Sequence, residues 1–185
     1  MHPIKICILI TVLFLPRIVA AQGPAAIDES FVRGRAAYSP AMTQSLLKKV
    51  EAFCASADKS ARDKVTTAVA AWQKRHAELL VENMRVRSEL LDEVNGSAAA
   101  QGLRAELDNM LNKQVPQQID ADYKKLVPQD ASKGWASKAF VCGANAGLIE
   151  QGQFDLERLD PQVSDYLRKR ISQPATAAEQ LRKQF

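Results

Sequence analysis

The sequence predicts an all-α protein, a helical bundle of four to five helices with a long central αα-hairpin and one disulfide. The stretch 60–94 contains no Gly or Pro, and its apolar side recurs at alternating steps of four and three. Ser39-Pro40 and Asp160-Pro161 each combine a capping side chain with a proline suited to the first helical position. No stretch shows the sustained alternation with β-branched residues that is typical of strands.

The first residues have the composition of a secretory signal peptide. Lys5 precedes an apolar run over 6–15, which Pro16 and Arg17 end, and small residues lead up to Ala21. A bilayer-spanning helix needs about 20 apolar residues, so this run is too short for a stable membrane anchor. We therefore expect cleavage after Ala21 and a periplasmic or secreted protein.

The charge distribution gives no support for a nucleic-acid partner. The formal net charge is +4, and removal of residues 1–21 would take away Lys5 and Arg17 but no acidic residue. Most of the remaining positive excess follows Tyr166. Nucleic-acid binding requires a basic face with interleaved aromatic residues, and the sequence shows no such pattern.

The mature chain is expected to hold one domain, because its length suffices for a single hydrophobic core. Residues 22–38 contain Gly23, Pro24 and Gly34 without clear periodicity, so we expect an irregular N-terminal arm. The helical domain is expected over 39–173, followed by a polar C-terminal tail over 174–185.

The first helix should begin at Ser39-Pro40 and end near residue 57. Its apolar side comprises seven residues: Met42, Leu46, Leu47, Val50, Phe53, Cys54 and Ala57.

The central helix is expected to begin at a capping box formed by Ser60 and Asp63 and to end at Asn95-Gly96. An unbroken helix over this stretch would be a rod of roughly 50 Å. Its buried stripe comprises Val65, Val69, Trp72, His76, Leu79, Asn83, Val86 and Leu90. Asn95-Gly96 favours a tight turn with a left-handed backbone, and we prefer this to its formal match, with Ser97, to a glycosylation acceptor.

Three further helical segments follow. The apolar side of the next helix meets Pro116, where we expect a kink or break, and the pattern resumes until residue 126. A helix rich in Ala and Gly should start near Asp130 or Ser132 and end at Gly152. The last helix should start at Asp160-Pro161.

Cys54 and Cys142 are the only cysteines after the predicted cleavage site. Two cysteines in an oxidising compartment usually pair, so we predict a structural disulfide between the first and the Ala/Gly-rich helix. The spacing lacks the Cys-x-x-Cys arrangement of redox-active pairs. Two buried thiols are the alternative.

His76 is the only histidine of the mature chain, which excludes zinc sites built from several histidines. Together with Asn83 it lies on the apolar stripe, where polar residues often fix helix register. A ligand-binding or pH-sensing role for His76 is the sharper alternative, and we predict no catalytic, cofactor-binding or metal-binding residue.

The acidic clusters and the charged central helix have ordinary structural interpretations. Asp120 with Asp122, and Asp155 with Glu157 and Asp160, lack calcium-loop spacing and are expected to cap helices or face solvent. Pairs four residues apart, Lys74–Glu78 and Arg85–Glu89, indicate a salt-bridged outer face.

These observations favour a non-catalytic protein without cofactors that binds another envelope or secreted protein, as an inhibitor or immunity protein or an assembly factor would. A homodimer is compatible with the sequence. The alternative is a small helical enzyme or ligand-binding protein with a charged pocket, which requires Arg75, Arg85 or Arg87 to point inward with Glu82 or Gln73.

Overall fold

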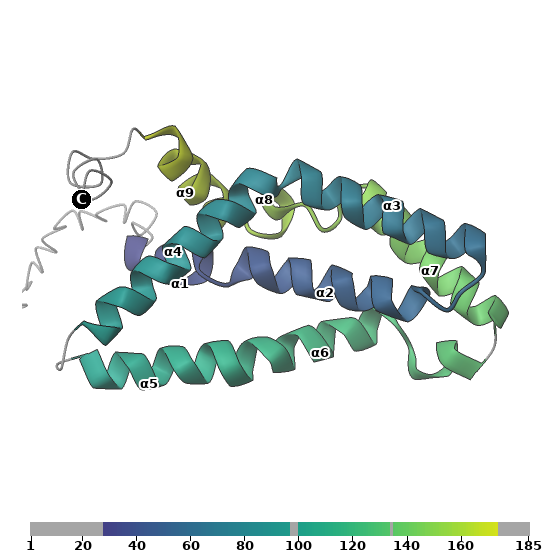
Figure 1. The fold of residues 1–185 in the computed structure, drawn as a ribbon, viewed down its shortest axis with the longest axis horizontal. Coiled ribbons are helices and arrows are strands. Elements are labelled where there is room, and N and C mark those ends of the chain that lie inside the picture. Colours follow the sequence, from purple (N-terminus) through teal and green to yellow (C-terminus); the bar gives the residue numbers. More distant parts are fainter. Residues whose placement is uncertain (1–27, 97–99, 134, 174–185) are drawn as a thin grey trace, which may run out of the picture.

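A computed structural model describes residues 28–96, 100–133 and 135–173, in which every regular element is helical. This confirms the predicted all-α class (Figure 1). The elements are α1 (Glu29–Ala36), α2 (Ser39–Cys54), α3 (Lys59–Arg75), α4 (Ala77–Asn95), α5 (Gln101–Asn109), the π-helical turn η2 (Met110–Gln114), α6 (Val115–Leu126), the 3₁₀ turn η3 (Gln129–Lys133), α7 (Trp135–Glu150), α8 (Leu156–Leu159) and α9 (Pro161–Ser172).

Helix α2 occupies the middle of the molecule and packs against α3 on one side and α6 on the other (Figure 1). Helix α7 runs along α3, and α9 packs against α1 and α4. The small residues of α7 and α3, such as Ala146 and Ala68, let these two helices approach closely around the buried Trp72. The hydrophobic core therefore draws on helices from both ends of the described chain.

Residues 29–36 form α1, so the expected irregular arm is wrong for this part of 22–38. Asp28 caps the helix by accepting a hydrogen bond from the Ser30 amide at 2.9 Å. Val32 and Ala36 are buried against α4 and α9. The helix is stabilised by tertiary packing at a short apolar face, which periodicity over so few residues does not reveal.

The predicted unbroken central helix is also wrong, because the chain leaves helical geometry at His76 (φ −106°, ψ 13°). Two helices result, α3 and α4, and Figure 1 shows the bend between them. The bend lets α3 follow α7 while α4 packs against α1 and α9. Hydrogen bonds of Arg75 and His76 with Asp155, in the connection between α7 and α8, hold the chain at this point.

Pro116 neither kinks nor breaks its helix in the expected way. The Pro116 nitrogen has no hydrogen, and the chain forms the π-helical turn η2 just before it, with the Val115 amide bonded back to the Met110 carbonyl. Helices α5 and α6 continue in one line through this turn (Figure 1).

Helix ends agree with the sequence at some positions and differ at others. Asp160 caps α9 as expected, and Gly152 is left-handed (φ 70°) after α7. The cap of α3 is Asp58 instead of Ser60, with its carboxylate 3.1 Å from the Ala61 amide. Gly96 has a right-handed backbone (φ −78°), so the expected left-handed conformation is absent there.

The predicted signal peptide (1–21), the polar tail (174–185) and Ser97 lie outside the described residues. Within residues 28–96, 100–133 and 135–173, no helix is both long and apolar enough to cross a membrane.

Candidate interaction surface

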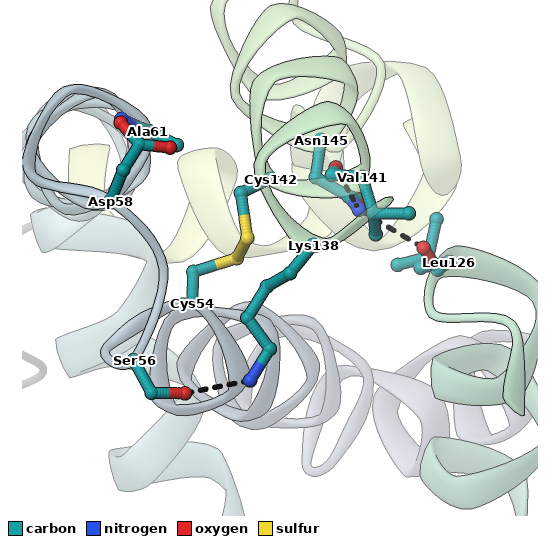
Figure 2. The surroundings of a disulfide bond; sticks show 9 residues. All are labelled: Cys54, Ser56, Asp58, Ala61, Leu126, Lys138, Val141, Cys142 and Asn145. Carbon is teal, nitrogen blue, oxygen red and sulfur yellow. Dashed lines mark hydrogen bonds between the residues drawn. A yellow bond between two sulfur atoms is a disulfide. The ribbon is translucent and has the colours of Figure 1, made fainter. Parts of the chain in front are cut away.

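Cys54 and Cys142, the expected pair, are bonded in the structure with their sulfur atoms 2.04 Å apart. Figure 2 shows the bond joining the end of α2 to the middle of α7. Lys138 reaches across the same two helices and donates to the Ser56 hydroxyl at 2.7 Å. On the other side of α7, the Asn145 amide donates to the Leu126 carbonyl at 3.0 Å. These contacts fix α7 and the end of α6 around α2.

His76 lies in a cluster that fastens the bend to the α7–α8 connection. Its side chain is 3% exposed, with Nε2 3.1 Å from Asp155 Oδ1 and Nδ1 3.7 Å from Glu157 Oε2. Arg75 also donates to Asp155, at 2.9 Å. Burial alone would raise the pKa of Asp155, but hydrogen bonds from Arg75 and His76 outweigh it and lower this pKa.

Trp72 of α3 and Asn83 of α4 make hydrogen bonds on either side of the bend at His76. The Trp72 indole donates to the Phe154 carbonyl at 2.8 Å, beside the His76 ring. The buried Asn83 amide donates to the Ala36 carbonyl at 2.6 Å and so ties α4 to the end of α1. Asn83 is one of the two polar stripe residues, with His76, for which we predict a register-fixing role, and its contact joins two helices.

The charged middle of α4 points partly inward. Glu82 is 6% exposed, and its two carboxylate oxygens accept from Arg85 at 2.8 Å and from Arg170 of α9 at 2.6 Å. Burial acts to raise the pKa of Glu82, and these two guanidinium groups more than offset that effect and lower it. Arg170 also binds Glu89, the residue that the sequence paired with Arg85.

Several carboxylates of the acidic clusters form ion pairs with other elements, beyond the capping or solvent-exposed roles that we expected. Asp155 holds the bend, and Asp160 pairs with Arg35 of α1 while it caps α9. Asp120 pairs with Lys49, and Asp122 pairs with Lys125. The described residues contain no group of three or more His, Cys, Asp or Glu side chains placed to hold a metal ion.

Residues 101–126, which we call the α5–α6 arm, form an amphipathic rod along one side of the molecule (Figure 1). No side chain of the arm is fully buried. The apolar side of its first half comprises Leu103, Leu107, Met110 and Leu111. Leu103 is 57% exposed, and the other three are half-buried. An apolar stripe of this length without a full covering helix is unusual in a folded monomer.

Two pockets flank α6 where it packs on α2. The first, of about 390 Å³, lies between Met42 and Leu46 of α2, Ile119 of α6, and Phe154 and Leu159 of the connection to α9. Its walls are mainly apolar.

The second pocket, of about 380 Å³, lies on the other side of α6 and carries positive charge. Lys49 and Phe53 contribute from α2, and Tyr123 and Lys124 from α6. The sequence did not predict this pocket, because two separate helices bring its residues together, although Phe53 lies on the predicted apolar side of the first helix. Their only sequence signal is the spacing of Lys49 and Phe53 on one side of the first helix.

No protein-family model matches this chain, and neither a curated protein nor a solved structure matches it.

Proposed function

We propose that this chain is an exported, periplasmic, non-catalytic protein that binds another envelope or secreted protein through the α5–α6 arm. In this proposal the fold is a bundle of four to five helices in which α4 and the arm make the central hairpin. The signal-like N-terminus motivates the location. A specific inhibitor or immunity protein and an envelope assembly factor are the two roles of this type.

The observation that carries the proposal is the apolar side of the arm's first half, where Leu103 is exposed and no residue is fully buried. Leu103, Leu107 and Met110 recur on one face of α5 and its continuation, while α5 itself packs mainly against the end of α4. Burying such a side chain is worth about 1.5–3 kcal/mol relative to leaving it exposed. A partner that covers Leu103 would gain energy of this order, and it would gain less at Leu107 and Met110, which are already half-buried. Helix α2 packs against α6 and so holds the second half of the arm before the partner binds.

A small enzyme or ligand-binding protein with a charged pocket is the alternative, and the buried Glu82 is the one observation in its favour. The arginines that it requires to point inward include Arg75 and Arg85, whose side chains are 41% and 37% exposed. In addition, Arg85 and Arg170 already occupy both oxygens of Glu82. The two pockets beside α6 are lined by other residues. The charges of Glu82, Arg85 and Arg170 thus stabilise one another, which supports the binding role over a charged ligand pocket.

The test is affinity capture from a periplasmic extract of the source organism with the mature protein, under oxidising and reducing conditions. Leu103→Glu places a charge on the arm, and Val81→Glu is the matched control at a 63% exposed position on α4. We expect one dominant partner at near-equal stoichiometry, retained by Val81→Glu and lost with Leu103→Glu. Many weak clients would indicate a chaperone. Capture that Leu103→Glu leaves unchanged, or no capture by any form, would contradict the proposal.

A further inference from the structure

We propose that the second pocket beside α6 binds an acidic segment of the partner, with a carboxylate on Lys124, next to the Lys49–Asp120 pair, and a neighbouring aromatic side chain against Phe53 and Tyr123. This inference rests on the proposed function and names the chemistry of the partner. It concerns residues on the face of α6 opposite to the mainly apolar pocket.

The positive charge of this pocket comes from three lysines on three helices. Lys49 of α2 and Lys124 of α6 line it, and Lys138 of α7 lies beside it over the Phe53 ring, 4.7 Å from the ring centre. Asp120 is the one acidic residue in the lining. The surroundings therefore carry more cations than anions, which complements a negatively charged segment.

Contacts within the fold hold two of these lysines, Lys49 and Lys138. Lys49 lies over the Tyr123 ring, 4.9 Å from its centre, and the Lys138 ammonium is anchored on Ser56 (Figure 2). Cation–π contacts of this kind keep an ammonium group next to an aromatic wall. A ligand that joins an anion to an apolar ring meets both kinds of group at once.

Asp120 shows how a carboxylate is received in this pocket. It accepts a hydrogen bond from Lys49, which lowers the pKa of Asp120, and the positive charge of Lys124 acts in the same direction. Lys124 itself makes no ion pair with any described residue. One carboxylate is thus already bound on the Lys49 side, while Lys124 is available to a second.

This arrangement predicts opposite effects for two neighbouring substitutions. Lys124→Gln removes the available cation and should weaken binding of an acidic segment. Asp120→Asn removes the intramolecular competitor of the ligand carboxylate and releases Lys49, so it should strengthen binding. A merely structural role for the Lys49–Asp120 pair does not predict stronger binding.

The probe is the peptide acetyl-SFDG-amide, titrated into isotope-labelled protein and followed by NMR shifts of α2 and α6. The controls are acetyl-SFNG-amide, which lacks the charge, and acetyl-SADG-amide, which lacks the ring. Loss of a charge-assisted hydrogen bond should weaken binding about tenfold. We expect the two control peptides and Lys124→Gln to show weaker binding, Asp120→Asn stronger binding, and the exposed control Lys59→Gln no change.

Equal binding of acetyl-SFNG-amide and acetyl-SFDG-amide would overturn the inference, as would an unchanged affinity of Lys124→Gln. Shifts confined to residues outside α2 and α6 would do the same. Because the peptides require no natural partner, failure here leaves the Leu103→Glu capture result untouched. Conversely, if the capture experiment fails, the peptide titration still shows whether this pocket binds an acidic segment.

Discussion

Reduction of the Cys54–Cys142 bond tests how strongly the fold depends on this cross-link. The bond joins residues 88 apart in sequence, so the chain-entropy model gives a loss of about 4.6 kcal/mol in the free energy of unfolding. A domain of this size typically has roughly 5–15 kcal/mol in total. The same loss should lower the melting temperature by roughly 10–18 °C.

Urea unfolding followed by circular dichroism measures this loss for oxidised and fully reduced protein. The double variant Cys54→Ala, Cys142→Ala is the second comparison. Both sulfur positions are fully buried, so truncation should cost a further 1 kcal/mol or so at each site. The chain-entropy model predicts a difference of about 4.6 kcal/mol between the unfolding free energies of oxidised and reduced protein. A difference below about 1.5 kcal/mol would refute the argument that the bond stabilises the fold by restricting the unfolded chain.

Three further substitutions test individual contacts. Arg170→Met should lower the free energy of unfolding by about 1–3 kcal/mol, because the buried Glu82 loses one of its two cationic partners. Urea unfolding measures this loss, and an unchanged free energy of unfolding would contradict the role given to the Arg170–Glu82 pair. Folding lowers the pKa of Glu82, so the contribution of Glu82 to stability is present above the ordinary carboxyl range and is lost as the pH falls through the lowered pKa. Glu82→Gln should therefore flatten the plot of unfolding free energy against pH in this range. An unchanged slope would contradict this assignment to Glu82. Gly152→Ala should cost about 1–2 kcal/mol, since Gly152 has φ 70° and an added Cβ would lie 2.7 Å from Asp155 Oδ2; thermal unfolding that matches the parent protein would disprove this.

Local patterns in the sequence account for the helices that have strong start signals. Ser39-Pro40 and Asp160-Pro161 begin α2 and α9, and Gly152 follows the end of α7. These residues act through their own backbone geometry, which does not depend on distant neighbours. The all-α class follows from the same kind of signal.

The features that sequence reasoning missed depend on contacts between distant segments. His76 continues the apolar periodicity, so the sequence gives no sign of the break in the helix there. The contacts at the break join His76 to Asp155 and Glu157, about 80 positions later in the chain. Helix α1 is likewise short and forms against α4 and α9. The second pocket beside α6 forms only where α2 and α6 pack together, so no local sequence pattern links Lys49 with Lys124.

Site-specific photocrosslinking in living cells tests the proposed binding surface most directly. A photoreactive phenylalanine analogue replaces Leu103 on the arm in one variant and Val81 on α4 in the other, both of which are exposed side chains. The proposal predicts one discrete adduct of defined mass from position 103 and none from position 81. Absence of an adduct at position 103, or the same labelling pattern from both positions, would contradict binding through the α5–α6 arm.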